Sequence, residues 1–495
     1  MSYSLLTGAT GLVGGYLLRY LLEQQQRVAV LVRSTRLESA VQRIDTVMRR
    51  WEDLEGCPLP RPVVLEGDLC RADLGLAATD QQWIADNCDS ILHNAASMTF
   101  REDKKSGEPF RTNVDGVRNV LSLCRQAGIR HFHHVSTAYI CGLRTGVVRE
   151  TELDFGQENG NVYERSKLTG EKLVLADDSL DKVTIYRPAS VVGDSQTGFT
   201  TSTHGFYLPL QLAHVMADKV PAELMGDRFS KLLGLKGHEG KNLVTVDWLA
   251  KAIVRLVARP ECHGTTYHLS SPTPVTVVSI QAVIQEAIQK YSKRNTTRWP
   301  TEQELVGFEA LFRQYMDIYR SHWRDDPIFD RTNTDRALPD LPCPQIDHEM
   351  LLRISAYPVK KNFALREVNK DRHAVAVRQH LEPLMRAATQ RTDTAAPDSS
   401  LALQISGPGG GQWQLLTCNG EVVGAKPGLG QQETGCIYLN ANTFSLLQEG
   451  RATVEDAIDT GRVIVEDCDA AAHDPLGILQ TLVSSSRREV PANTA

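Results

Sequence analysis

A tyrosine and a lysine four residues apart, Tyr163 and Lys167, are the side chains of this sequence best suited to proton transfer. On a helix this spacing brings both side chains to one face. A tyrosine titrates at about pH 10, but a neighbouring ammonium group stabilises the phenolate and lowers that pKa. We therefore predict that Lys167 tunes Tyr163 as a general acid or base. The alternative is a pair of surface residues on a helix with no chemical role.

Two hydroxyls, those of Ser136 and Thr137, follow the apolar stretch 129–136, which is predicted to be a strand. Because side chains alternate between the two faces of a strand, only one of these hydroxyls faces the reacting groups. The alternation alone does not decide which one, so both remain candidates. Such a hydroxyl donates a hydrogen bond to a carbonyl oxygen beside the tyrosine. A hydroxyl, a phenol and an ammonium together suit hydride transfer with proton delivery to a developing alkoxide.

A glycine-rich turn near the start of the chain indicates the hydride donor. The apolar strand 2–6 leads into glycines spaced three apart, and the amphipathic helix 16–24 follows. In such a turn the first glycine permits the bend, the second lets the backbone approach a pyrophosphate, and the third lets the helix pack on the strand. The sequence therefore predicts a dinucleotide-binding turn. Its expected contacts are Gly8, Thr10, Gly11, Leu12, Val13 and Gly14.

The residues after the second predicted strand, 28–32, select the cofactor. An acidic residue at this position holds the ribose hydroxyls of NAD, whereas an arginine accommodates the 2′-phosphate of NADP. Arg33 and Arg36 follow the strand here, and the first acid is Glu38. NADPH is therefore the predicted cofactor. The alternative is that both arginines are solvated charges of a loop.

Strands and helices continue to alternate over residues 1–275. Further strands are predicted at 63–66, 90–97, 129–136 and 182–188, and helices at 37–51 and 112–123. This alternation predicts an α/β fold with a doubly wound parallel sheet, a Rossmann fold.

The ends of these strands are expected to supply the remaining cofactor contacts. Asp68 is placed to contact the adenine, and the small residues after the fourth strand let the backbone lie against the cofactor. Asn113 opens a helix, where it either supports a proton relay or caps the helix. The predicted contacts outside the glycine turn are Arg33, Arg36, Asp68, Leu69, Asn94, Ala95, Ala96, Asn113, Lys167, Pro188 and Val191.

The remainder of the chain divides into three parts. Residues 276–390 are predicted to form a helical extension that caps the first domain, with helices at 278–291, 302–322 and 350–353 and an aromatic, acidic stretch at 323–330. Residues 391–400 resemble a linker. Residues 401–485 are predicted to form a small α+β domain. Its expected strands are 401–406, 412–417, 436–439 and 461–466, its helices are 443–449, 454–459 and 475–483, and a disordered tail begins at 484.

Composition excludes several classes of protein. The net charge of −6 over 495 residues argues against nucleic-acid binding, and no apolar run is long enough to span a bilayer. The glycine turn lies so early that no signal peptide is expected before it. The ten cysteines form no C-x-x-C pair, so neither a zinc site nor a disulfide framework is indicated. We expect a cytoplasmic protein, with peripheral membrane contact left open. The histidines expected to be buried without binding metal are His93, His131, His133 and His134.

Residues 1–275 resemble the extended short-chain dehydrogenase/reductases, and more narrowly the thioester reductases, which include fatty acyl-CoA reductases and the reductase domains of carboxylic acid reductases and peptide synthetases. The motifs that carry the resemblance are 31–33, 67–69, 93–96, 135–139, Tyr163 with Lys167, and 186–194. In that family the hydroxyl five residues before the glycine, here Gly142, is catalytic, which selects Thr137. The resemblance implies NADPH and reduction of an acyl thioester to an aldehyde or alcohol. Sugar epimerases and hydroxysteroid dehydrogenases share the same core.

The last domain is similar to sterol-carrier-protein-like domains, through the stretches 411–415, 444–450 and 457–463. This resemblance implies a lipid or sterol-like ligand. The alternative is a plain packing module or a dimerisation module of a homodimer.

Three functions fit this sequence. The favoured one is an NADPH-dependent reductase of a lipid-like acyl thioester, carried by coenzyme A or by a carrier protein. The second is an NAD(P)-dependent dehydrogenase of a sterol or other lipid alcohol, similar to 3β-hydroxysteroid dehydrogenases. The third is a lipid carrier whose nucleotide fold is regulatory, and the presence of Thr137, Tyr163 and Lys167 together argues against it.

Overall fold

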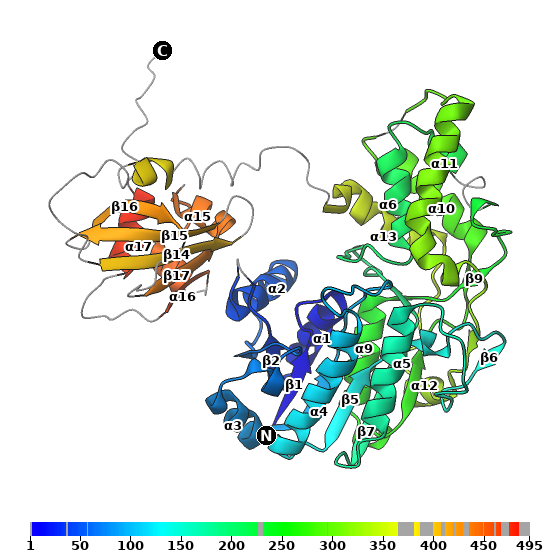
Figure 1. The fold of residues 1–495 in the computed structure, drawn as a ribbon, viewed down its shortest axis with the longest axis horizontal. Helices are drawn as coiled ribbons and strands as arrows, with labels where there is room; N and C mark the ends of the chain where they lie inside the picture. The colour runs from blue at the N-terminus through cyan, green and yellow to red at the C-terminus, as the bar shows by residue number, and fades with distance from the viewer. Residues whose placement is uncertain are drawn as a thin grey trace. The chain divides into compact units, whose positions relative to one another are not determined.

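The computed structural model divides into two compact units, Met1–Val32 with Cys57–Leu365 and Arg33–Gly56 with Arg366–Ala495 (Figure 1). The residues that it describes are 2–35, 38–56, 58–225, 231–294, 296–364, 381–386, 399–406, 411–418, 421–428, 435–448, 450–459, 462–466 and 475–484.

A seven-stranded parallel sheet forms the centre of the first unit, with the order β11-β7-β5-β4-β1-β2-β3. The strands are β1 (Tyr3–Thr7), β2 (Val28–Val32), β3 (Val63–Glu66), β4 (Cys88–His93), β5 (His131–Val135), β7 (Lys182–Pro188) and β11 (Thr266–Leu269). The strand order reverses between β1 and β4, and ligands of such sheets bind at the carboxyl ends beside this reversal. The predicted doubly wound α/β fold is confirmed, with β11 as a strand that the sequence analysis missed.

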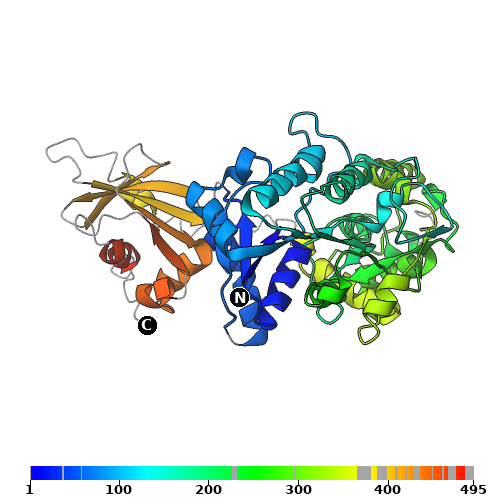
Figure 2. The same cartoon turned by 90° about the horizontal axis from the view of Figure 1, so that it is seen from below.

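Helices cover both faces of this sheet. They are α1 (Leu12–Glu23), α3 (Ala78–Asn87), α4 (Gly116–Ala127), α5 (Val162–Leu175) and α9 (Val246–Val257). Helix α1 packs against α9, whereas α4 contacts α3 and α5 on the opposite face (Figure 2). The core between them is built by apolar strand residues such as Leu5, Ile91 and Phe132. Strand β2 is buried along its whole length, as its uninterrupted apolar sequence predicts.

A second group of helices in this unit shares its own apolar cluster. These helices are α6 (Tyr207–Met216), α7 (Ala222–Met225), α10 (Val277–Tyr291), α11 (Glu302–Met316) and α13 (His348–Lys360). Leu210 of α6, Val283 of α10 and Ile354 of α13 belong to one buried cluster, so the extension packs on residues that precede it in the chain. The helix predicted at 302–322 ends at Met316 and continues as a 3₁₀ turn. No helix in the described part of the chain has the length and apolar character to cross a membrane.

Short strand pairs connect the loops of the first unit. They are β8 (Ser190–Val192) with β10 (Leu243–Thr245), β9 (Gly240–Lys241) with β12 (Val275–Thr276), and β6 (Val147–Val148) with β13 (Ile328–Phe329), which α12 (Thr332–Ala337) follows. The β6–β13 pair joins the end of the aromatic, acidic stretch to the loop after β5.

The second unit contains α2 (Ala40–Glu55) and a five-stranded sheet with the order β16-β15-β14-β17-β18. Its strands are β14 (Ser399–Ser406), β15 (Gly411–Cys418), β16 (Glu421–Pro427), β17 (Cys436–Asn440) and β18 (Val463–Glu466), and its helices are α15 (Ala441–Gln448), α16 (Val454–Asp459) and α17 (Pro475–Ser484). Phe444 and Leu479 pack on the sheet in a common core. The sequence analysis missed β16. Most of the predicted linker, and the predicted tail beyond Ser484, lie outside the described residues.

Candidate active site

The glycine turn between β1 and α1 is shaped for close backbone contacts. Gly8 has φ +74°, and a Cβ there would lie 2.8 Å from the backbone of Ala95. A Cβ on Gly14 would lie 1.9 Å from the Gly8 carbonyl oxygen, so no side chain fits at either position. In the described structure Gly11 caps α1 without a side-chain hydrogen bond, and the first turn holds no acid. The amides at the start of α1 and the positive end of the helix dipole therefore suit a pyrophosphate.

Thr7 fastens this turn to the end of β4. Its Oγ1 accepts the backbone N–H groups of Asn94 (3.2 Å) and Ala95 (3.1 Å). The Thr7 hydroxyl proton is then left for His93 Nδ1, 2.9 Å away. The predicted cofactor residues Asn94 and Ala95 thus lie beside the glycine turn, and Ala96 next to them is exposed. No cluster of three or more His, Cys, Asp or Glu in the described ranges is arranged to hold a metal.

The loop after β3 carries the residues predicted to contact adenine. Asp68 is half-buried, and its Oδ1 accepts the backbone N–H of Cys70 (3.0 Å). The carbonyl oxygen of Leu69 accepts from Asn119 Nδ2 (2.7 Å), which fixes the loop on α4.

The other predicted cofactor residues lie on separate elements. Arg33 is exposed directly after β2, and Arg36 lies outside the described residues. Pro188 is the last residue of β7, and Val191 lies in β8.

Asn113 holds the loop after β4 against α5. Its Oδ1 accepts the Ser97 backbone N–H (2.7 Å), and its Nδ2 donates to the Ser97 carbonyl oxygen (3.0 Å) and to Ser166 Oγ (2.9 Å). Asn113 lies inside the π-helix Arg111–Asp115, which runs directly into α4, and not at its N-cap position. The capping alternative is therefore wrong, because the side chain bridges two other elements.

The three predicted catalytic residues lie around the carboxyl end of β5. Lys167 Nζ donates to the carbonyl oxygen of Val135, the last residue of this strand (2.8 Å). Thr137 follows two residues later, with its hydroxyl 3.4 Å from the Pro188 carbonyl oxygen. Tyr163 lies in the first turn of α5, one turn before Lys167. Within the described part of the chain, the buried Ser136 Oγ has no hydrogen-bond partner.

Burial sets the protonation states of this group. It raises the pKa of Tyr163 above its ordinary value, and the charge of Glu164 raises that pKa further. The expected lowering by Lys167 is therefore not found, and Tyr163 is a neutral phenol at neutral pH, with a proton available for donation. Burial lowers the pKa of Lys167 to about 8, against the opposing charge of Glu171.

Two of the buried histidines lie close to Lys167. His93 and His134 stack with their ring centroids 5.5 Å apart. Burial lowers the pKa of each, and the charge of Lys167 lowers both further. Both rings are therefore neutral at neutral pH.

A buried ion pair anchors the catalytic helix to the sheet. Arg187 of β7 and Glu171 of α5 are both buried, and Arg187 Nη2 lies 2.5 Å from Glu171 Oε1. Sequence analysis assigned neither a role. The four-residue spacing of Glu171 from Lys167 is a signal that places it on the same helix face.

An aromatic wall made of Phe100, His204, Tyr319 and His322 adjoins Tyr163. The ring of Phe100 lies 5.4 Å from that of Tyr163, 4.8 Å from Tyr319 and 5.9 Å from His204, between centroids. His322 is in T-shaped contact with Phe100 at 6.1 Å, and burial lowers its pKa to about 4. These residues come from segments far apart in the chain, so no local sequence pattern indicates them.

The aromatic, acidic stretch fastens the extension to the turn after β5. Asp326 Oδ2 accepts from Tyr139 Oη (2.9 Å) and from the Asn242 backbone N–H (2.8 Å), and Lys241 Nζ donates to Asp326 Oδ1 (2.6 Å). Arg324 donates to the carbonyl oxygens of Gly142 and Leu143. The stretch thereby fixes the backbone that follows Thr137.

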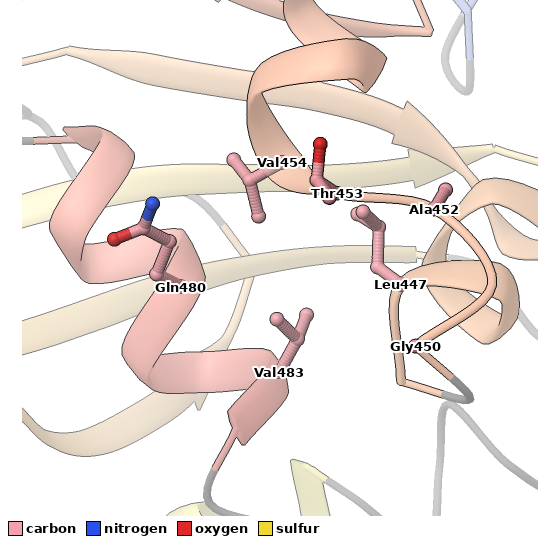
Figure 3. Close-up of a pocket in the computed structure, with 7 residues that line it drawn as sticks. All are labelled: Leu447, Gly450, Ala452, Thr453, Val454, Gln480 and Val483. Carbon is pink, nitrogen blue, oxygen red and sulfur yellow. The ribbon is translucent and has the colours of Figure 1, made fainter.

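The small α+β domain has a hollow between α15, α16 and α17, shown in Figure 3. It is lined by Leu447, Gly450, Ala452, Thr453, Val454, Gln480 and Val483. Its volume is about 180 Å³, whereas small-molecule pockets commonly measure about 300–1,000 Å³. The lipid ligand of this domain therefore stays a prediction, and the hollow would have to widen to admit one.

Two alanine substitutions test the glycine turn. We expect Gly14→Ala to lower both the melting temperature and nucleotide affinity, because its Cβ collides with the Gly8 carbonyl oxygen. Gly11→Ala is the matched control for folding, since its Cβ meets its nearest neighbour at an ordinary 3.4 Å. It should melt as the wild type does, yet bind a reduced nicotinamide dinucleotide about 10-fold more weakly because the methyl group occupies the pyrophosphate approach. Thermal melting and the fluorescence of the bound dinucleotide measure both effects, and wild-type binding by Gly14→Ala would contradict this picture.

Comparison with known proteins identifies similar chains. Residues 6–253 match the family described as "Male sterility protein". A linear gramicidin synthase from Brevibacillus parabrevis is 26% identical over 377 residues, which cover 72% of this chain and 7% of that protein. A putative fatty acyl-CoA reductase of Drosophila melanogaster is 31% identical over 152 residues, 29% of each chain. The matched part spans between 7% and 37% of the first curated relatives.

A solved structure shares the fold of the first unit. The terminal R domain from the myxalamid PKS-NRPS biosynthetic pathway has a TM-score of 0.57 and 27% identity, and the match covers 73% of this chain and 92% of that one.

Proposed function

Because the chain belongs to the family of NAD-binding domains described as male sterility proteins, we propose that it is a nicotinamide-dependent reductase that converts acyl thioesters to aldehydes. One observation carries the proposal: Lys167 donates a hydrogen bond at the carboxyl end of β5, and Lys167 lies on the same helix as Tyr163. Strand β5 is joined to the glycine-turn strand β1 through β4, so the carboxyl end of β5 that Lys167 contacts and the glycine turn lie at the same edge of the sheet.

The cofactor that we propose is NADPH. No side chain caps the amides at the start of α1, and neither Gly8 nor Gly14 has room for a Cβ. Both features support the binding of a dinucleotide. Arg33 directly after β2 supports the phosphorylated form, because no acid lies between the end of this strand and Glu38. When bound, the nicotinamide supplies a hydride to the thioester carbonyl carbon.

The residues of the chain act on the carbonyl oxygen and on the ribose. As the carbon–oxygen double bond accepts electrons, Tyr163 donates a hydrogen bond to the oxygen that becomes negative. Thr137 donates a second one when its hydroxyl turns from the Pro188 carbonyl oxygen, which it reaches only at 3.4 Å. The raised pKa of Tyr163 suits this role, since only the neutral phenol donates. Lys167, fixed by the Val135 carbonyl oxygen, binds a ribose hydroxyl and contributes positive charge. The carbon–sulfur bond then breaks, the thiolate leaves, and the aldehyde forms.

The substrate that we propose is a lipid-like acyl thioester on coenzyme A or on a carrier protein. The aromatic wall beside Tyr163 supports an apolar acyl or carrier segment at this position. The likeness to a putative fatty acyl-CoA reductase supports coenzyme A, and the likeness to a gramicidin synthase supports a carrier protein.

The test is NADPH oxidation by the purified full chain with acyl-CoAs of increasing length. NADH, and a sterol with NAD, are measured in parallel. We expect NADPH oxidation that depends on the thioester and releases one free thiol for each aldehyde formed. Thiol release with NADH alone would overturn the cofactor assignment. Oxidation of the sterol without any thioester turnover would move the protein to the lipid-alcohol dehydrogenases.

The pH dependence of kcat/KM should report the charge on Lys167. The lysine loses its proton as pH rises through about 8, so kcat/KM should be level below that pH and fall above it. Lys167→Arg keeps a positive charge throughout and should remove the fall, although at a lower overall rate. The carboxyl of Glu164, next to Tyr163, also titrates in this range, because burial raises its pKa to about 7. Glu164→Gln removes this carboxyl and shows how much of the pH dependence of kcat/KM comes from it. A fall that begins only above about pH 10, near the ordinary lysine pKa, would show that burial does not lower the pKa of Lys167.

A further inference from the structure

The aromatic wall contains a histidine whose two ring nitrogens are in different states. His204 Nδ1 lies 2.6 Å from Tyr319 Oη. In this contact the phenol is the better donor and the neutral imidazole nitrogen the better acceptor, so the Tyr319 hydroxyl proton is directed to His204 Nδ1. Nδ1 is therefore an acceptor, and the ring proton resides on Nε2. No residue in the described ranges accepts a hydrogen bond from this Nε2–H.

The position of His204 links this unused donor to the reacting groups. Its ring packs on Phe100, and Phe100 packs in turn on Tyr163 and Tyr319. His204 is only half-buried, so its free edge is accessible to a ligand. Phe100 contacts both rings, at 5.4 Å from Tyr163 and 5.9 Å from His204 between centroids.

The electrostatics of the wall favour a neutral ligand group. Burial lowers the pKa of His204, so the ring is uncharged at neutral pH. His322 at the same wall is also neutral, and the nearby Arg101 is paired with Asp317 at 2.9 Å. A carboxylate placed here would lose its hydration without meeting an unpaired cation, whereas an amide oxygen needs only one donor.

We propose that His204 is a substrate-binding residue whose Nε2–H donates a hydrogen bond to an amide carbonyl oxygen of the thioester, while the substrate lies along Phe100 with its reacting carbon at Tyr163. The inference rests on the proposed function and adds a recognition element to it. Two parts of a thioester substrate can supply the amide: the thiol arm, as in coenzyme A, or the acyl group, as in an N-acylaminoacyl thioester. Tyr319 is the positioning residue that selects the tautomer.

Three thioesters separate these sources. The first is a saturated acyl-CoA, the second is the S-ethyl thioester of the same acid, and the third is an S-ethyl thioester of an N-acylglycine. In His204→Phe, which removes the donor but keeps a ring against Phe100, we expect kcat/KM to fall about 10-fold on a substrate with the recognised amide, mainly through KM. The plain S-ethyl thioester should be unaffected. A loss confined to the acyl-CoA assigns the amide to the thiol arm, and a loss confined to the N-acylglycine derivative assigns it to the acyl group.

Further variants keep the test decisive. His204→Asn retains an N–H donor and should restore part of the lost kcat/KM, and Tyr319→Phe should cause a smaller loss because the ring proton is then free to occupy either nitrogen. His348→Phe, at an exposed histidine paired with Glu286, is the control. Equal losses on all three thioesters, or no loss on any, would overturn the inference.

A binding measurement separates this inference from the proposed function. Calorimetry with an unreactive alkyl thioether of coenzyme A, and with the matching N-acylglycine thioether, measures recognition without turnover. Weaker binding of one of them to His204→Phe supports the inference even if no thioester is reduced. Unchanged binding of both, with normal thioester turnover, overturns the inference and leaves the proposed function standing.

Discussion

Replacing Tyr163 by phenylalanine should lower thioester turnover by about 10²- to 10³-fold while NADPH binds as in the wild type. The size follows from the loss of one preorganised donor to the developing oxyanion. Phenylalanine keeps the ring that packs on Phe100, so the wall and the fold should persist. The loss should appear in kcat rather than in KM, because the hydrogen bond strengthens only as the oxygen gains charge.

The control for this substitution is Tyr315→Phe, which removes a phenol from an exposed position on α11. It should leave kcat unchanged. Steady-state kinetics with an acyl-CoA, together with NADPH fluorescence for binding, gives both quantities. Turnover by Tyr163→Phe equal to that of the wild type would remove Tyr163 from the mechanism.

The glycine turn could be predicted because its signal is local. Strand β1, the glycines and α1 follow one another in the sequence, and each glycine has its reason in neighbouring backbone. The apolar pattern predicts that α1 starts at Tyr16, whereas the helix starts at Leu12. The extended conformation of Gly11 ends the turn earlier than the apolar pattern suggests. Strand β11 was missed because it is short and its pairing partner, β7, lies far back in the chain.

The chemistry of the site could be predicted only in part. The spacing of Tyr163 and Lys167 identified the proton-transfer pair as a candidate, but the direction of the tyrosine pKa depends on burial and on Glu164, which are properties of the folded chain. The pairing of His204 with Tyr319 joins residues that the sequence separates by the whole of α6 to α11. Such contacts carry no periodic pattern, so sequence reasoning could not find the wall beside Tyr163.

Loss of the Glu171 carboxylate should destabilise the first unit by about 3–5 kcal/mol, because it leaves the Arg187 guanidinium buried without its counter-charge. Glu171→Gln tests this with little change in volume. Asp181→Asn is the matched control, since its pair with Arg130 is exposed on both sides and should contribute less than about 1 kcal/mol. Urea unfolding of the two variants and the wild type gives the comparison.

The same substitution also links stability to catalysis. The charge of Glu171 opposes the lowering of the Lys167 pKa by burial, so its removal should shift the fall of kcat/KM to a pH below about 8. Replacing Glu171 and Arg187 together by methionine removes both buried charges, and should recover much of the stability while the shifted pH profile remains. A Glu171→Gln variant that unfolds like the Asp181→Asn control would show that Arg187 is held well enough by its other acceptors, the carbonyl oxygens of Glu150 and Glu152. In that case the ion pair would act on Lys167 alone, and the pH profile would be its only measurable consequence.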